Sequence, residues 1–390
     1  MDHMATTPLL PEVLEAMLPY FTQHFGNPAS LHSWGDAARE AVEASRAQVA
    51  AFIGARPEEI VFTGSGTEAN NMAIKGLAQA QEKKGRHIVV SAIEHFSVLQ
   101  AARTMEKRGF EVTLVPVDAD GLVSPAAVAA SLRPDTVLVS VMLANPEVGT
   151  IEPVREIATV VKEHGAIMHT DAVAAAGQIP INVEELGVDA LSLAACQFYG
   201  PKGVGALYLR RGVRLIPLMD GGVQEGGRRP GTDNVPGIVG MGRAAALAPA
   251  RLPQYAEHLQ SLRERLFTGI TASVEHILIT GHRQQRLPGH ASFCVRFIEG
   301  EAMLMLLDAR GVACSSGSAC TSRALKTSHV LTAMNVPAET AQGSLVFSLG
   351  LDNTAEDVDH VVEVLPPVVQ RLRQMSPLWD KFLKGKKEGS

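Results

Sequence analysis

The stretch IVFTGSGTEANNMAIKGLAQA at residues 60–80 combines a short apolar run, a glycine-containing turn and an apolar-faced helical pattern. Residues 60–63 predict a buried strand, and the predicted helix begins within GSGTEANN. Small residues between a strand and a helix let backbone N–H groups approach an anion, which the helix dipole also favours. The stretch therefore predicts a strand–helix unit with a candidate phosphate site, and a plain tight turn explains the same glycines about equally well.

The same alternation of strand and helix continues for about 150 residues. Predicted strands lie at 88–92, 112–117, 136–142, 166–173 and 204–209, and predicted helices at 11–21 and 152–164. Near-continuous apolar strands separated by helices indicate a mostly parallel sheet covered on both faces. After about residue 250 a long helix at 255–273 and strands near 276–280 and 291–297 predict a smaller α+β domain.

Composition narrows the class of protein. The 390 residues are 46% hydrophobic and 19% charged with a net charge of -6, which is typical of a folded globular chain. Mild acidity and 5% aromatic residues argue against a nucleic-acid surface. No apolar run reaches the ~18 residues of a membrane helix and no secretory pattern is present, so a cytoplasmic protein is expected. The four cysteines are too few for a disulfide framework.

Four polar segments directly follow predicted strands: 64–67, 94–95, 145–149 and 171–174. Because ligands of open α/β sheets bind beyond the carboxyl ends of the strands, we expect these segments to line one site. Asp171 is suited to pair with a protonated ring nitrogen, as in pyridoxal phosphate (PLP) enzymes, or to cap a helix. His95 is suited to stack on a cofactor or shuttle protons, although a lone histidine at a strand end is more often structural.

Two glycine-bearing loops carry further candidates. SSGSACTS at 315–322 predicts an exposed loop with Cys320 near its tip, and an exposed thiol is a candidate nucleophile or sulfur carrier. GGVQEGGRRPGTDN at 221–234 is either an anion site, through Arg228, Arg229 and Thr232, or a solvated surface loop.

Taken together, these segments resemble the NifS/IscS-type cysteine desulfurases of the class V aminotransferase group. The resemblance covers nearly the whole chain. It runs from DHMATTPLLPEVLEAMLPYF through FTGSGTEANNMAIKG, HTDAV, FYGPKGVGALYLR and SSGSACTS to SHVLTAM. It implies a PLP-dependent transferase of fold type I, with a mostly parallel seven-stranded sheet in a large domain at 14–255. A smaller α+β domain would combine residues 1–13 and 256–390. The family forms homodimers that take sulfur from L-cysteine as a persulfide and pass it to tRNA thiolation or to an Fe–S scaffold protein of the IscU or NifU type.

The resemblance also assigns roles to single residues. Gly66 and Thr67 would contact the PLP phosphate, and Asp171 would pair with the pyridine nitrogen. Thr232 would reach the phosphate of the neighbouring subunit. The catalytic assignments are His95, which would stack on the ring, and Cys320, which would carry the persulfide.

Other positions depart from the family pattern. Gln197 stands where the family has the lysine that binds PLP as a Schiff base, and an amide cannot form that bond. Val346 stands where an arginine would bind the substrate carboxylate. The remaining departures are Pro146, Ala174, Ala194 and Cys196. Because each lost charge-assisted contact is worth about 1.5–3 kcal/mol, we expect weak binding of PLP and cysteine.

Three hypotheses follow. The first is a protein of sulfur or Fe–S assembly that works without PLP, docks a scaffold and uses Cys320 as thiol, persulfide acceptor or cluster ligand. The second is an active desulfurase that binds PLP non-covalently and forms a persulfide on Cys320. The third is an Fe–S cluster or other metal in the pocket, with Cys196, Cys320 and His95 as ligands. Colour separates them, since PLP compounds are yellow and Fe–S clusters brown.

Overall fold

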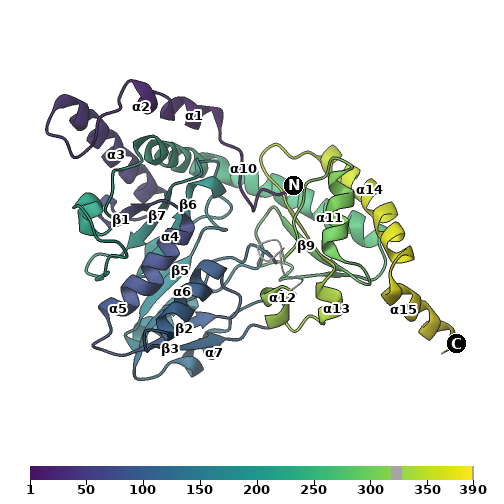
Figure 1. The fold of residues 1–390 in the computed structure, drawn as a ribbon. Coiled ribbons are helices and arrows are strands. Elements are labelled where there is room, and N and C mark those ends of the chain that lie inside the picture. The colour runs from purple at the N-terminus through teal and green to yellow at the C-terminus, as the bar shows by residue number, and fades with distance from the viewer. Residues whose placement is uncertain (318–326, 389–390) are drawn as a thin grey trace.

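A seven-stranded sheet forms the centre of the larger part of the molecule (Figure 1). The computed structural model describes residues 1–317 and 327–388. In the order β1-β7-β6-β5-β4-β2-β3, the strands are Ile60–Thr63, Gly205–Leu209, Ala190–Ala194, Ile167–Asp171, Thr136–Ser140, His87–Ser91 and Glu111–Val115. Strands β2 to β6 pair in parallel, whereas β7 is antiparallel to both β1 and β6. The predicted mostly parallel sheet is therefore present.

Alternate residues of each strand enter two different cores. Ile88 and Leu138 pack on one face of the sheet, and Val89 and Val139 pack on the other. The first face is covered by α6 (Phe96–Glu106) and by the helical run α4 (Gly66–Asn71), η2 (Met72–Leu77) and α5 (Ala78–Ala80). The second face is covered by α3 (Ser33–Phe52), α8 (Val154–His164) and the first part of α10 (Val235–Ser273). This double cover explains why the strands read as continuous apolar runs.

Short helices complete this part. They are α1 (Pro11–Met17), α2 (Pro19–Thr22), η1 (Pro57–Glu59), α7 (Pro125–Ser131), α9 (Val183–Leu186), η3 (Ala195–Gln197) and η4 (Gln224–Gly227). The helix predicted at 11–21 is thus two helices with a break at Leu18, because Pro19 starts a new first turn and has no N–H for the preceding helix.

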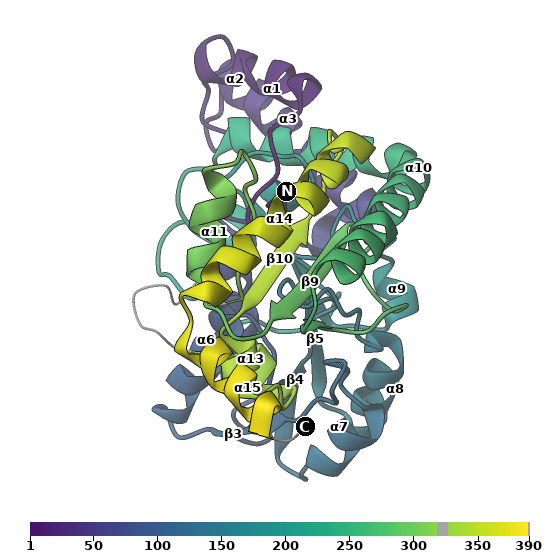
Figure 2. The same cartoon turned by 90° about the vertical axis from the view of Figure 1, so that its right-hand side faces the viewer.

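The smaller part contains a three-stranded antiparallel sheet in the order β10-β9-β8 (Ser344–Ser348, His290–Val295, Ile277–Ile279). The end of α10 packs there with α11 (Gly300–Asp308) and α14 (Ala355–Gln374), and α12 (His329–Ala333), α13 (Ala338–Ala341) and α15 (Pro377–Glu388) complete it. Helix α10 runs through both parts (Figures 1 and 2), so Met241 belongs to one core and Leu266 to another. The predicted boundary at residue 255 therefore falls within a continuous helix, and the domain bounds stay a prediction.

Residues 1–7, called the N-terminal strap below, join the two parts. The His3 N–H donates to the Ser348 carbonyl at the end of β10 (3.1 Å), and the Met4 N–H donates to the Ser348 hydroxyl (2.8 Å). At its other end, the Thr7 N–H donates to the Cys196 carbonyl in η3 (2.8 Å). The strap thereby runs between the sheets, where Figures 1 and 2 place the N-terminus.

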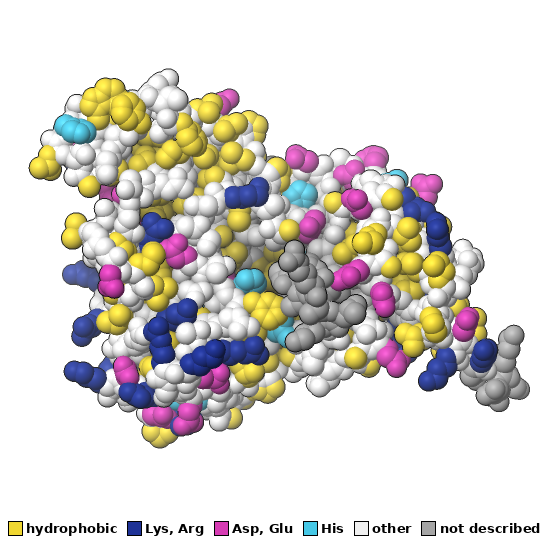
Figure 3. Space-filling view, viewed as in Figure 1, with side chains coloured by type: hydrophobic (Ala, Val, Ile, Leu, Met, Phe, Trp, Pro, Cys, Tyr) yellow, Lys and Arg dark blue, Asp and Glu magenta, His cyan; other side chains and the backbone are white. Residues whose placement is uncertain are grey.

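Apolar side chains gather on the surface of α1, α2 and the start of α3 (Figure 3). The exposed ones are Leu14, Leu18, Phe21, Phe25, Leu31 and Trp34. In the described residues, no helix combines the length and apolar character needed to cross a membrane.

Candidate functional site

A chain of four polar side chains lies beyond the carboxyl end of β5. Asp171 ends that strand, and its carboxylate accepts from the Asn70 amide nitrogen (2.6 Å) and from the Val173 N–H (2.9 Å). The same Asn70 nitrogen donates to the Ser97 hydroxyl (2.8 Å), which lies 2.7 Å from Nδ1 of His95. Helices α4 and α6 thus hold Asp171 and His95 in one network.

This network fixes the tautomer of His95. The Ser97 N–H points at Nδ1 of His95 (3.1 Å), and a backbone N–H can only donate, so Nδ1 is an acceptor. The ring proton of neutral His95 is therefore on Nε2. Because both hydrogens of the Asn70 amide nitrogen have acceptors, its Oδ1 is the atom left over, and that buried oxygen has no hydrogen-bond partner.

A cavity of about 350 Å³ opens against this network. Gly66 and Thr67 at the start of α4 line one side, and a side chain at position 66 would collide with Val173 Cγ2 at 2.6 Å. The apolar wall residues include Met4, Met142, Pro146, Ala174 and Ala194. No lysine or arginine of the described residues is among the lining side chains, and Asp171 is the one carboxylate there.

The turn η3 after β6 supplies Cys196 and Gln197 to the same cavity. The Gln197 amide nitrogen donates to the Met4 carbonyl (3.0 Å), which ties the turn to the N-terminal strap. The Thr6 hydroxyl is hydrogen-bonded to the half-buried Cys196 thiol. Burial raises the pKa of Cys196, and the charge of Lys202 opposes that rise.

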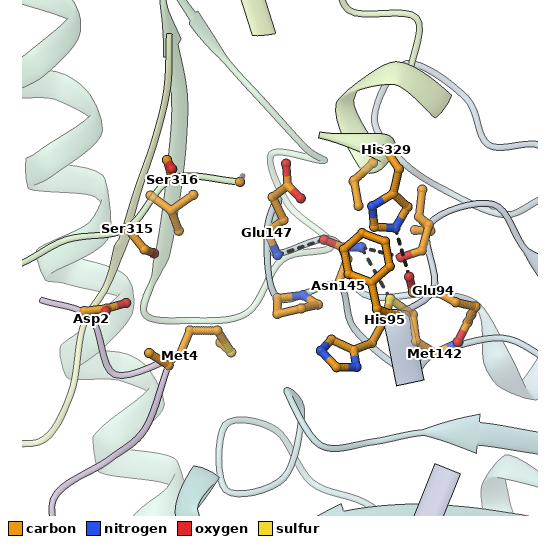
Figure 4. A pocket seen from close by; sticks show the side chains of 17 residues that line it. Asp2, Met4, Glu94, His95, Met142, Asn145, Glu147, Ser315, Ser316 and His329 are labelled. Carbon is orange, nitrogen blue, oxygen red and sulfur yellow. Dashed lines mark hydrogen bonds between the residues drawn. The ribbon is translucent and has the colours of Figure 1, made fainter. Parts of the chain in front are cut away.

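A second cavity of about 160 Å³ shares Met4, His95 and Pro146 with the first (Figure 4). Asp2 and Ser315 lie on one side of it, and Glu94 and His329 on the other. Val346, in β10, is 3% exposed and forms a two-hydrogen-bond bridge with Ser315. The position where the resemblance expects a carboxylate-binding arginine is therefore an apolar wall.

Three carboxyl groups line this second cavity. Each of Asp2, Glu94 and Glu147 has a buried oxygen without a hydrogen-bond partner. Burial raises the pKa of Glu147 to about 8 and raises that of Glu94 well above its ordinary value, as it raises that of Asp171. The described residues put no lysine or arginine into either wall, so an anion there would depend on the backbone N–H groups at the start of α4.

Most of the residues singled out from the sequence do meet. Gly66, Thr67, His95, Asp171, Cys196 and Gln197 line the 350 Å³ cavity. Thr232 is exposed and is absent from that lining, so its predicted reach into a neighbouring subunit stays a prediction. Cys320 lies outside the described residues, and within them no three His, Cys, Asp or Glu side chains gather as a metal site.

Asn70, Ser97 and the N-terminal strap were not anticipated. Asn70 lies one helical turn after Thr67, and Ser97 lies two residues after His95. The first spacing is a signal that could have found Asn70, since residues three apart share a helix face. The second is the spacing at which a helix-capping side chain meets the first turn, which could have found Ser97. The strap has no such signal, because its partners Cys196 and Ser348 are distant in sequence.

Comparison with known proteins assigns the family. The sequence pattern described as "Aminotransferase class-V" matches residues 1–361, and the chain belongs to that family. Cysteine desulfurase IscS of Methanosarcina thermophila is 50% identical over 381 residues, which cover 98% of this chain and 94% of that protein. The IscS of Dictyoglomus turgidum is 48% identical over 387 residues, covering 99% and 98%.

Solved structures agree with these relatives. A structure titled "NIFS-LIKE PROTEIN" is similar with a TM-score of 0.89 at 38% identity, covering 95% of this chain and 99% of that one. "SspA in complex with cysteine" gives a TM-score of 0.80 at 34% identity, covering 89% and 97%. The resemblance to NifS/IscS-type cysteine desulfurases and the fold type I architecture are thereby confirmed.

PLP is the cofactor expected of this family, and the cavity meets only part of its requirements. Asp171 is placed to accept from a protonated ring nitrogen, and the unpartnered Asn70 oxygen beside it needs a donor. No described amine lines the cavity to bind the aldehyde carbon, and no described cation balances the phosphate. The described walls therefore do not fit PLP as a covalently anchored cofactor.

Four buried groups predict the pH dependence of stability. Burial lowers the pKa of His169 and His290 from 6.5 to about 3, and raises the pKa of Glu147 and Glu152 from 4.5 to about 8. Between pH 3 and 6.5 the two histidines bind protons in the unfolded chain but stay neutral in the folded protein, so the free energy of unfolding falls as the pH falls. Between pH 4.5 and 8 the folded glutamates keep protons that the unfolded chain loses, so stability falls as the pH rises.

We therefore expect the melting temperature to be highest between about pH 4.5 and 6.5. Thermal unfolding across the pH range measures this. E152Q should flatten the alkaline decline, whereas E156Q, an exposed acid on α8, should leave the curve unchanged. A wild-type melting temperature that still climbs between pH 6.5 and 8 would contradict the expectation.

Proposed function

We propose that this chain is a sulfur-transfer protein of the cysteine desulfurase family that works in Fe–S assembly without covalently bound PLP. Cys320 would accept sulfur from an external persulfide or polysulfide, and the chain would pass this sulfur to an Fe–S scaffold protein. The observation that carries the proposal is Gln197. This residue stands where the family has the lysine that binds the cofactor, and its amide nitrogen donates a hydrogen bond to the Met4 carbonyl. The Val346 wall supports it, since a cysteine carboxylate finds no described cation there.

The proposal includes a homodimer in the cytoplasm. The apolar surface of α1, α2 and α3 supports a dimer, since contiguous exposed apolar side chains of this kind mark interfaces. The three described cysteines are free thiols, which suits a reducing compartment.

The test compares two reactions of the purified chain. Incubation of the chain with L-cysteine and PLP is expected to release no more sulfide than the same mixture of L-cysteine and PLP without the protein. Incubation with inorganic polysulfide is expected to add sulfane sulfur to the peptide that contains Cys320, as measured by alkylation and mass spectrometry. When a scaffold protein is then added, it should acquire sulfane sulfur from the wild-type chain and not from C320S. Sulfide release from cysteine well above the PLP background would overturn the proposal.

That opposite result would favour the second candidate, an active desulfurase with non-covalent PLP. Asp171 and the unpartnered Asn70 oxygen favour it, because they present acceptors to a protonated ring nitrogen. A yellow chain whose spectrum changes on adding L-cysteine would identify this case. A brown chain with iron and acid-labile sulfide would indicate a cluster instead.

A further inference from the structure

Cys196 differs from the other described cysteines because its side chain lines the 350 Å³ cavity. Cys294 is fully buried in β9, and Cys314 lines neither this cavity nor the second one. The Cys196 carbonyl is held by both the N–H and the hydroxyl of Thr7 (2.8 and 3.0 Å), which fixes the turn. Burial raises the pKa of the Cys196 thiol and the charge of Lys202 opposes that rise, so the thiol reacts through a minor thiolate fraction. A nucleophile thus stands in a cavity large enough for a small molecule.

A second observation shows what the cavity lacks. Asn70 is 1% exposed, its amide nitrogen is fully used by Asp171 and Ser97, and its Oδ1 has no partner. A buried acceptor without a donor costs about 1–3 kcal/mol, so a ligand that brings an N–H stabilises it. Asp171 lines the same cavity and adds negative charge. With no described lysine or arginine in the wall, this oxygen pair recognises an ammonium group and disfavours a carboxylate.

From this geometry we infer that Cys196 is a second sulfur acceptor, which takes sulfur from small amine-bearing persulfides or disulfides whose ammonium group binds Asp171 and Asn70. The inference rests on the proposed function for its biological setting and names the substrate class of this cavity. The Cys196 thiolate attacks the outer sulfur of R–S–SH, so a new S–S bond forms on Cys196 while the S–S bond of the persulfide breaks. The electron pair leaves with R–S⁻, and the persulfide proton stays on the transferred sulfur. With a disulfide R–S–S–R the same attack gives Cys196–S–S–R and R–S⁻.

Disulfide exchange with charged probes tests the inference on the intact chain. The probes are cystamine, which is cationic, bis(2-hydroxyethyl) disulfide, which is neutral, and dithiodipropionate, which is anionic. The rate of modification is followed on the Cys196 peptide by mass spectrometry, and each rate is divided by that of the same peptide in urea-unfolded chain. We expect the normalised rate with cystamine to exceed that with dithiodipropionate by about tenfold or more, since 1.4 kcal/mol of differential binding gives that factor.

Matched variants assign the preference. D171N removes the negative charge and should reduce the cystamine preference toward unity, whereas E156Q removes an exposed charge and should leave it unchanged. If D171N does not fold, protection of the wild-type chain replaces it. Ethylammonium should then slow alkylation of Cys196 by neutral iodoacetamide, and propionate should not.

Equal normalised rates for cationic and anionic probes, or a Cys196 that reacts only when unfolded, would overturn the inference. These outcomes are separate from failure of the proposed function. If the chain releases sulfide from L-cysteine, the proposed function is refuted, and the charge preference of Cys196 is still decided by the disulfide-exchange rates. A chain that loads Cys320 with sulfur and shows no preference at Cys196 refutes the inference alone.

Discussion

Replacing Gln197 with lysine is expected to change a chain that loses PLP on gel filtration into one that retains it after borohydride reduction. The physical reason is the position of Gln197 in the wall that also contains Asp171 and His95. A lysine there supplies the primary amine that the described wall lacks. Sulfide release by Q197K should stay low, because Val346 still leaves the substrate carboxylate without a cation.

The double variant Q197K/V346R should release sulfide from cysteine about 10²-fold faster than V346R, since a positioned acid–base group contributes at least about that factor. It should also be faster than Q197K, because the arginine supplies the cation for the substrate carboxylate. The matched control is Q197M, which loses the hydrogen bond to Met4 without adding an amine and should retain no PLP. The measurements are absorption after gel filtration and a sulfide assay. Equal PLP retention by wild type, Q197M and Q197K would contradict the assignment of position 197.

Replacing Glu225 with glutamine is expected to lower the free energy of unfolding by about 3–5 kcal/mol. Glu225 forms two short contacts with Arg46 (2.7 and 2.8 Å) and accepts from the Phe62 N–H at the edge strand β1. The side chains of Arg46 and Glu225 are 11% and 3% exposed, so the variant leaves a buried guanidinium without its main counter-charge. Because this pair anchors the loop that carries Thr232, the loop should also become more susceptible to proteolysis.

A control for this prediction exists on the same arginine. Glu43 also pairs with Arg46 (3.1 Å), but its side chain is 57% exposed. E43Q should therefore cost less than about 1 kcal/mol, because water screens an exposed pair. Urea unfolding of the three proteins measures both values. Similar losses in E225Q and E43Q would contradict the view that burial decides the contribution of each acid.

The strands were predictable wherever a continuous apolar run ended at a turn. Residues 60–63, for example, form β1 with the predicted bounds. Strands β6 and β10 were not anticipated, since ALSLA and SLVFS are short and mix serine with apolar residues. The helix predicted at 255–273 begins at Val235 in the structure. Pro249 and Pro253 lie inside it, although prolines in a sequence suggest a helix boundary. Tertiary packing overrides that preference here.

The candidate site could be predicted only as far as strand ends locate it. The rule that ligands bind beyond the carboxyl ends of strands correctly grouped the segments that carry Gly66, His95 and Asp171. What it could not supply are the contacts between side chains, such as Asn70 bridging Asp171 and Ser97. The unpartnered carboxyl oxygens of Asp2, Glu94 and Glu147 were equally invisible, because burial of one atom depends on the whole tertiary structure.

The N-terminal strap also has a consequence for biosynthesis. His3 and Met4 are made before their partner Ser348, which follows 345 and 344 residues later. At roughly 5–20 residues per second, that separation corresponds to a delay of roughly 20–70 s on the ribosome. Contacts of such long sequence separation form late, because loop-closure entropy opposes them. The contacts of the strap with Ser348 can therefore form only after the last described β-strand is made, whereas its contacts with Cys196 and Gln197 have partners that are made earlier.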